Sequence, residues 1–249
     1  MSRVVWIALG CLAYVIFLLA NLPASQVIGR LSLPQDISFT GINGTIWDGR
    51  IDSAVVQGIP IKNAKWQLDA LPLLWGSISI HLDVGNHREA DDISAFGPLT
   101  ISALNTDNIS AENLHVYVPV EMLIARLPLP LPVRASGRLH VNLTELEIDG
   151  QCQTVIGSGS WLNAQVSGTQ GMIDFGQYNA QLDCESGAFV VMLDGNNRLA
   201  LEARAVVSDI NNISVSGRFK PDPQFPQEVH QAATFFGQTD ADGYYTVKL

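Results

Sequence analysis

Alternating apolar and polar positions recur along the chain and predict β-strands with one solvent-exposed face. In residues 77–84 aliphatic side chains occupy every second position, from Ile78 to Val84, so they share one face of an extended strand. Residues 64–69 and 198–205 show the same period of two. Helical periodicity is scarce, and the pattern contains no strand–helix–strand unit of the kind that builds parallel sheets. We therefore expect a mainly β fold, built as an antiparallel, curved meander.

One segment changes phase within a strand pattern. In residues 138–148 the apolar positions up to Leu143 share one parity, whereas Leu146 and Ile148 take the other. A slip of one residue turns every later side chain to the opposite face of the sheet. We therefore expect a β-bulge or sharp bend near Thr144.

Glycines recur at intervals that suit the breaks between successive strands of a meander. The predicted breaks are at Gly41, Gly44, Gly85, Gly97, Gly137, Gly150, Gly187 and Gly195. Three segments favour short helices: a single turn at 71–75, about two turns at 120–127 before Pro128, and a helix at 227–236 followed by a final turn and strand.

The N-terminus predicts a transmembrane helix over residues 4–22, which are nineteen residues without a charge. About 20 apolar residues cross the hydrocarbon core, whereas the apolar core of a signal peptide is usually about 7 to 15 residues long. We favour an uncleaved anchor. The alternative is cleavage by a signal peptidase at the small residues of 22–25, LPAS. Because Arg3 precedes the helix and the next charge is Arg30, the positive-inside rule places Met1 in the cytoplasm.

The expected domain organisation follows from these elements. Residues 1–3 form a cytoplasmic N-terminus, 4–22 the transmembrane helix, 23–36 a juxtamembrane linker and 37–249 a β-rich domain on the far side of the membrane. Alternate prolines in 127–133 (LPLPLPV) cannot donate to a regular ladder, so they predict a division between two lobes there. The domain is then either one unit or two closely packed lobes.

Composition supports a folded domain and narrows its partners. Apolar residues make up 47% of the chain and charged residues 15%, which supplies a core and argues against disorder. The net charge of −10 disfavours nucleic acid as a partner. Beyond the anchor only Cys152 and Cys184 remain, and this even pair is a candidate disulfide in an oxidising compartment; two free buried thiols are the alternative.

The sequence matches none of the common catalytic or metal-binding patterns. The serine and glycine spacing of 157–161 (GSGSW) does not fit a nucleophile elbow, and no glycine-rich phosphate loop opens a helix. The five histidines are isolated, and the charged stretch 87–92 (HREADD) is better explained as a solvated loop than as a cation site. We therefore expect no enzymatic activity, no cofactor, no metal and no small-molecule substrate.

A family resemblance rests on several short pieces in a fixed order. They are GINGTIWDGR at 41–50, KWQL followed by LPLLWGSISIHL within 65–82, VPVEML at 118–123, SGRLHVNL at 136–143, GSGSW at 157–161 and a C-terminal helix followed by DGYY. Together they resemble the type II secretion system protein N family, also called general secretion pathway protein N. The motif residues, for which we expect a structural role, are Gly41, Gly44, Thr45, Trp47, Gly49, Trp66, Trp75, Gly159 and Trp161.

The resemblance implies a single-pass inner-membrane protein of a Gram-negative bacterium, with a periplasmic domain in the machinery that exports folded proteins. Its expected partners are other type II secretion proteins and the inner membrane. Within the first motif, Gly41 and Gly44 suit tight turns, and we expect Ile46 and Trp47 to begin a strand in which Trp47 fills a gap in the core; binding a partner is the alternative for Trp47.

Two functions from different classes remain open at this point. The first is a tethered scaffold whose sheet contacts other secretion proteins, for instance by strand addition. The second is a membrane-anchored module that binds or transfers lipid, because a curved apolar face can hold acyl chains. An apolar face can equally pack against a second sheet, so the alternating pattern alone does not separate the two functions.

Overall fold

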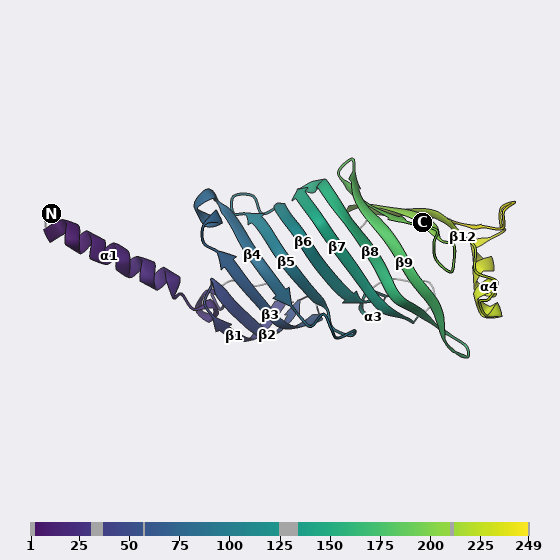
Figure 1. Cartoon of the computed structure of the whole chain (residues 1–249), viewed down its shortest axis with the longest axis horizontal. Helices are drawn as coiled ribbons and strands as arrows, with labels where there is room; N and C mark the ends of the chain where they lie inside the picture. The colour runs from purple at the N-terminus through teal and green to yellow at the C-terminus, as the bar shows by residue number, and fades with distance from the viewer. Residues whose placement is uncertain (1–2, 31–36, 57, 125–133, 210–211, 249) are drawn as a thin grey trace.

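A single antiparallel sheet of thirteen strands dominates the computed structural model, which describes residues 3–30, 37–56, 58–124, 134–209 and 212–248 (Figure 1). The strands follow one another across the sheet in the order of the sequence, as expected for a meander. Helix α1 projects from the end of the sheet that begins with β1, and α4 lies at the opposite end (Figure 1). The mainly β, antiparallel fold expected from the alternating pattern is confirmed.

The strands are β1 (Ile37–Gly44), β2 (Asp48–Val56), β3 (Ile59–Asp69), β4 (Ser77–Val84), β5 (Ser94–Ser102), β6 (Asn108–Pro119), β7 (Ala135–Asp149), β8 (Gln151–Gly168), β9 (Gly171–Glu185), β10 (Ala188–Leu193), β11 (Glu202–Asp209), β12 (Asn212–Phe219) and β13 (Tyr245–Lys248). The helices are α1 (Arg3–Ala20), α2 (Ala24–Ile28), α3 (Val120–Ile124) and α4 (Gln227–Ala233), with 3₁₀ turns η1 (Pro72–Trp75) and η2 (Thr234–Phe236).

Two of the three strands predicted from strict alternation are confirmed. Residues 77–84 form β4, and 64–69 form the second half of β3. The strand predicted over 198–205 was placed too early, because β11 begins at Glu202. The Asn197 side chain holds the preceding residues in a turn: its amide nitrogen donates to the carbonyls of Asp194 and Leu201, and its oxygen accepts from the backbone of Leu199 and Leu201.

The phase change in β7 is a β-bulge, as predicted. The ladder between β7 and β8 pairs Leu143 with Gly157 and then Glu145 with Ile156, so Thr144 is the extra residue. The apolar side chains on either side of Thr144 therefore stay on one face although their sequence parity changes.

Three glycines predicted as strand breaks instead lie inside strands. Gly41, Gly97 and Gly137 fall within β1, β5 and β7, each at positive φ. At Gly97 the register shifts, and an added Cβ would lie 2.8 Å from the Asn113 carbonyl oxygen of the next strand. The glycine is needed there because the neighbouring backbone comes so close, and not because the strand ends.

The helix predictions are largely confirmed. The turn at 71–75 is η1, and the segment 227–236 is α4 followed by η2. Helix α3 covers the first part of the helix predicted at 120–127. The rest of that prediction, and the predicted lobe division at 127–133, lie outside the described residues.

One face of the sheet is apolar from strand to strand, and we call it the apolar face. Its side chains share a side because they lie opposite one another across the ladders, as in the pairs Ile80–Leu99, Val118–Leu139, Leu139–Trp161, Trp161–Tyr178 and Leu182–Val191. Most of these side chains are only half-buried. All thirteen described strands belong to the same sheet, so no second sheet among them covers this face.

Candidate functional site

The C-terminal end of α1 is held against the turn between β1 and β2, residues 45–48, which we call the anchor turn. The indole Nε1 of Trp47 donates to the Leu19 carbonyl oxygen at 2.7 Å, and the backbone N–H of Ile46 donates to the Leu22 carbonyl at 3.0 Å. The last carbonyls of a helix lack i+4 partners within the helix, so the Trp47 indole caps α1, whereas Ile46 binds the chain just beyond the helix end. The apolar helix is therefore joined to the sheet by direct hydrogen bonds in addition to the chain itself.

The expectation that Ile46 and Trp47 begin a strand was wrong, because they form the bend of the anchor turn and β2 begins at Asp48. The backbone N–H of Thr45 donates to the Asp48 carbonyl at 2.8 Å, and the Thr45 hydroxyl accepts from the Asp48 N–H at 3.2 Å. These bonds close the turn and point the Trp47 side chain at α1. Trp47 therefore contacts the helix end and does not fill a gap in the core.

A second tryptophan fixes the anchor turn from the sheet side. Trp66 of β3 donates from Nε1 to the Ile46 carbonyl at 3.0 Å. Its ring lies over Gly49, where an added Cβ would be 2.2 Å from the ring. Any side chain at position 49 would therefore displace Trp66 and release the turn that holds α1.

Helix α1 is exposed along its whole length in the isolated chain. It is the single described helix that is long and apolar enough to cross a membrane. A soluble fold would hide such a helix in its core, but none of its residues is buried.

A pocket of about 510 Å³ opens on the apolar face where β7, β8, β9 and β10 lie side by side, with further walls from residues 199 and 201. Its lining is mainly aliphatic and aromatic, and includes Leu139, Val141, Trp161, Leu182 and Val191. Such a volume lies within the range of ligand sites, and an apolar lining favours apolar ligands. The pocket is therefore a candidate binding site.

Tyr178 of β9 places one polar atom in this apolar pocket. The side chain is 5% exposed, and its hydroxyl has no hydrogen-bond partner in the described part of the chain. Burial raises the pKa of the Tyr178 phenol, so the hydroxyl remains a neutral donor. A buried donor without an acceptor destabilises a protein, and a ligand that brings an acceptor would remove that cost.

The opposite face of the sheet is polar and has its own network, centred on Arg138 of β7. The guanidinium donates to the His87 carbonyl oxygen at 2.6 Å and to the Ser94 hydroxyl at 3.0 Å, and lies 4.6 Å from the ring centroid of Tyr117. These contacts tie the loop between β4 and β5 to the sheet. The charged stretch 87–92, interpreted from the sequence as a solvated loop, is thus bound at both ends by Arg138 of β7, through the carbonyl oxygens of His87 and Asp92.

Histidines line the same polar face without forming a metal site. His115 stacks on Phe96 with ring centroids 4.7 Å apart, and His140 stacks on Tyr117 at 4.2 Å. Burial, followed by the charges of His115 and Arg138, lowers the pKa of His140. Among the described residues no group of three or more His, Cys, Asp or Glu side chains is placed to hold a metal ion.

The family model of "Type II secretion system (T2SS), protein N" matches residues 35–248, which is most of the chain. The chain belongs to this family. Relatives named "Type II secretion system protein N" are 26% identical in Vibrio cholerae, over 90% of this chain and 88% of the relative, and 24% identical in Aeromonas hydrophila, over 99% and 97%. A third, in Klebsiella pneumoniae, is 24% identical over 92% and 88%. No solved structure matches the chain.

The structure distributes the protein N motif residues over four places. Gly44, Thr45, Trp47, Gly49 and Trp66 come together at the anchor turn, as described above. Gly159 and Trp161 line the apolar pocket, and the Trp161 indole donates to the Ser136 carbonyl at 3.1 Å. Trp75 is exposed at the end of η1, away from both groups. Gly41 lies within β1, where an added Cβ would meet the Asp52 side chain.

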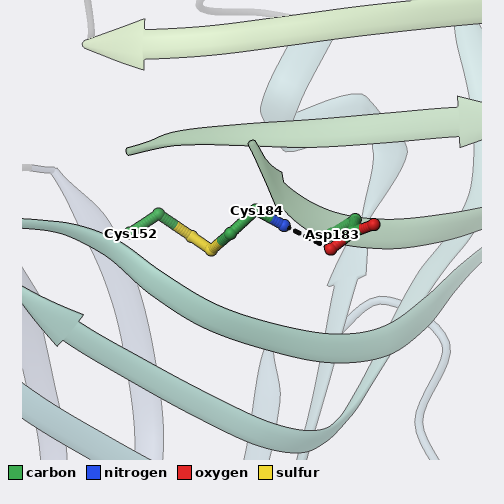
Figure 2. Close-up of a disulfide and its surroundings, with 3 residues drawn as sticks. All are labelled: Cys152, Asp183 and Cys184. Atoms are coloured by element: carbon green, nitrogen blue, oxygen red, sulfur yellow. Dashed lines mark hydrogen bonds between the residues drawn. A yellow bond between two sulfur atoms is a disulfide. The ribbon is translucent and has the colours of Figure 1, made fainter. Parts of the chain in front are cut away.

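Cys152 of β8 and Cys184 of β9 form a disulfide, with Cα atoms 5.8 Å apart (Figure 2). The backbone N–H of Cys184 donates to the Asp183 carboxylate at 2.7 Å (Figure 2). The bridge joins residues 32 positions apart and crosses the strand pair that carries Trp161 and Tyr178. The remaining cysteine, Cys11, is a free thiol on α1.

Three features of the site were missed from the sequence. Tyr178 sits in an alternating strand, and its burial depends on side chains of β7, β8 and β10 that line the same pocket. Arg138 was read as the first residue of a strand, and its reach to the loop at 87–92 is a contact across 51 positions. The role of Trp47 has a sequence signal, since it precedes an Asp-Gly pair after an apolar anchor, but that signal does not identify Leu19 as its acceptor.

Proposed function

We propose that this protein is a non-catalytic, inner-membrane component of a type II secretion system, with a periplasmic sheet domain that acts as a tethered scaffold. The observation that carries the proposal is the anchor turn, which fixes the end of α1 to β1–β3 by the bonds from Trp47 and Ile46. The names of its relatives support the assignment to the secretion system.

The orientation we propose places Met1 in the cytoplasm and the sheet in the periplasm. Arg3 precedes α1, and the next charged residue is Arg30, so the positive-inside rule favours this direction. The bridge between Cys152 and Cys184 supports it independently, because disulfides form and persist in the periplasm and are rare in the cytosol.

The proposed scaffold acts by confining the sheet domain to the membrane surface and by restricting its orientation. A helix in the bilayer confines the domain to the membrane surface, which raises its effective concentration toward membrane-bound partners. A flexible tether would leave the orientation of the domain free. The Trp47 bond to Leu19 restricts that orientation, so the same side of the sheet is presented each time.

Partner binding by strand addition has a natural place at the last full strand. Within the described residues β13 pairs only with Ser216–Phe219, so the outer edge of β12 near Asn212 and Ile213 faces no further strand. Ile213 is also among the exposed apolar side chains. We assign this edge to an extended segment of another type II secretion protein.

The test of tethering replaces residues 1–22 with a cleavable signal peptide, so that the same domain is released into the periplasm. We expect export of a secreted substrate to fall, because the domain is no longer held at the membrane. The matched control replaces α1 with an unrelated apolar span of the same length, ending in the Leu19–Pro23 segment, and should retain export. Unchanged export by the released domain would exclude tethering as the mechanism.

Crosslinking identifies the partners. A photoactivatable residue at Ile213 in the anchored protein should crosslink to another secretion component in cells that carry the machinery. The same residue at Ile156, an exposed position in the middle of the sheet, is the control and should give weaker or no crosslinks. If the two positions crosslink equally, the β12 edge has no special role.

A lipid-binding role is the second candidate, and the apolar pocket with Tyr178 favours it specifically. An acyl chain fits an aliphatic lining, and an ester carbonyl would accept the hydrogen bond that the buried Tyr178 hydroxyl lacks. The test is native mass spectrometry of the protein purified from membranes. Co-purified phospholipid that is lost in a Val141→Asp variant, but retained in an exposed Ser158→Asp variant on the same pair of strands, would support the carrier; absence of lipid from both would exclude it.

A further inference from the structure

An apolar patch protrudes from one end of the sheet, and neither the anchor turn nor the pocket uses it. It consists of η1 and the turn between β5 and β6. Leu71, Leu74, Trp75 and Leu104 are 68%, 77%, 76% and 92% exposed. We call these four residues the apolar knob. Large apolar side chains exposed together mark a contact surface, whereas single ones need no explanation.

The knob is a built feature of the fold. The backbone N–H of Ala103 donates to the Gly76 carbonyl at 2.8 Å, which joins the β5–β6 turn to the end of η1. An added Cβ on Gly76 would lie 3.8 Å from the Leu104 side chain, so Leu104 sits beside the turn. Gly76 itself has φ +75°, a conformation that ends the 3₁₀ turn and favours glycine.

The knob lies at the end of the strands where α1 is attached. In an antiparallel meander, alternate connections fall at the same end of the strands. The anchor turn joins β1 to β2, η1 lies between β3 and β4, and Leu104 lies between β5 and β6, so all three share one end. At a strand spacing of about 4.8 Å, η1 is roughly 10 Å along the sheet from the turn that caps α1. Figure 1 places the start of β4 at the end of the molecule from which α1 projects.

The two ends of the strands differ in charge. No charged residue occurs from Ala70 to Ile80, and the connection between β5 and β6, residues 103–107, carries a single charge, that of Asp107. At the other end, the connection between β4 and β5 carries Arg88, Glu89, Asp91 and Asp92. The two connections that form the knob therefore carry fewer charges than the connection between β4 and β5 at the opposite end.

We propose that the apolar knob inserts into the periplasmic leaflet of the membrane that α1 spans. The proposal rests on the proposed tethering through α1. Leucine side chains partition into the acyl region, and tryptophan favours the interface between acyl chains and headgroups. Because a single spanning helix can tilt in the bilayer, a second contact beside it would fix which edge of the sheet lies against the membrane.

The contact is apolar in nature. The chain carries a net charge of −10, and the knob contains no Lys or Arg to attract anionic headgroups. Insertion therefore depends on the burial of leucine and tryptophan and does not need anionic lipid. The proposed insertion therefore differs from membrane binding by clusters of basic residues, which depends on anionic lipid.

The experiment reads the depth of a fluorophore on the full chain in nanodiscs of zwitterionic phospholipid. In a Cys11→Ala background, Leu74→Cys and Phe235→Cys each supply one free thiol for an environment-sensitive dye, since Cys152 and Cys184 are bridged. Phe235 is the matched control: it is an aromatic side chain, 84% exposed, in η2 far from α1. A third sample carries the dye on the native Cys11, which reports whether α1 is in the bilayer.

We expect the dye at position 74 to be quenched by nitroxide-labelled lipid and shielded several-fold from aqueous iodide, and the dye at 235 to behave in the opposite way. Equal iodide access at 74 and 235, with Cys11 in lipid, overturns the inference and leaves the tether intact. Cys11 in water overturns both. Insertion at 74 that appears only with anionic lipid, or shielding that appears only when other secretion proteins are added, also overturns it in favour of charge or of a protein partner.

Discussion

On the polar face of the sheet, Arg138 bonds to a covering loop and the aromatic rings stack on one another. On the apolar face most side chains are only half-buried, and the pocket between β7 and β10 contains a phenol, that of Tyr178, for which the described residues supply no partner. The polar face thus joins its charged and aromatic groups mainly to one another, although Arg138 Nε, His115 Nδ1 and His140 Nε2 have no hydrogen-bond partner among the described residues. The apolar face is left with surface that a further molecule could cover.

This difference separates the side chains that stabilise the fold from those that are available for binding another molecule. The contacts that hold Arg138 are supplied by the protein itself, so removing them should destabilise the fold. Apolar surface on a monomer is tolerated when it serves binding. Changes on the polar face should therefore lower the free energy of unfolding, whereas changes in the pocket should alter binding first.

The largest expected effect comes from the disulfide that joins β8 to β9. Cys152→Ser opens a loop closed over 32 positions, and the loop-entropy relation gives a loss of about 3–4 kcal/mol in the free energy of unfolding. Urea unfolding followed by tryptophan fluorescence measures it. Reduced wild-type protein should match the variant, and Cys11→Ser should leave the transition where it was. A wild-type transition unmoved by reductant would show that the bridge adds no stability.

The next largest effect tests the polar face. Arg138→Ala removes charged hydrogen bonds to His87 and Ser94 together with the ring contact to Tyr117, which should cost about 2–3 kcal/mol. Arg204→Ala is the control, because Arg204 pairs with Glu185 on the surface and should lose under about 1 kcal/mol. Hydrogen exchange should also show the 86–93 loop opening in the first variant alone. Equal losses in both variants would remove the contrast between a network and a surface pair.

A pH effect of smaller size follows from His140. Its folded pKa lies below the ordinary value of 6.5 because burial disfavours the charged ring. The unfolded chain therefore binds the proton more readily, so stability is complete above pH 6.5 and declines as the pH falls from 6.5 toward the folded pKa. The Asp92 carboxylate has a lowered pKa and loses its contribution below 3.8, outside this window.

The measurement is the midpoint of urea unfolding at pH 7.5, 6.5 and 5.5. We expect the midpoint to fall with pH in the wild type and to fall less steeply in His140→Gln, whatever the baseline change from lost stacking on Tyr117. His81→Gln, at an exposed position on β4, controls for removing a histidine. An unchanged slope in His140→Gln would assign the pH dependence to other groups.

The sequence predicts the strands of the sheet better than it predicts the contacts that side chains make on its two faces. Strict alternation locates β4, and the phase change locates the Thr144 bulge, because both are encoded by neighbouring residues. The start of β11 was misplaced because Asn197 bonds to the backbone at both ends of a turn, which competes with an alternating pattern. A local sequence pattern therefore mispredicts a strand where a side chain makes the backbone hydrogen bonds that a neighbouring strand would otherwise make.

The candidate sites depend on register between distant segments. The pocket appears only when Trp161 and Tyr178 are placed opposite each other across β8 and β9, and the anchor turn only when Trp47 meets Leu19, 28 positions away. The sequence pointed to Trp47, Trp161 and the cysteines as notable residues. It did not give their contacts, because pairing over long separations is fixed by the whole sheet.

The variant with the smallest expected change in stability gives the sharpest test of the difference between the apolar face and the polar face. Tyr178→Phe removes a buried hydroxyl that has no partner among the described residues, so the ligand-free protein should change by under about 1 kcal/mol, in either direction. If the pocket holds an acyl lipid, the same variant should retain less of it after purification, because the ester carbonyl loses its donor. Tyr117→Phe on the polar face keeps the stacked ring and should leave lipid content unchanged. A Tyr178→Phe protein that unfolds much more easily, yet binds as before, would mean that the hydroxyl serves the fold and that the two faces are not divided in the way described.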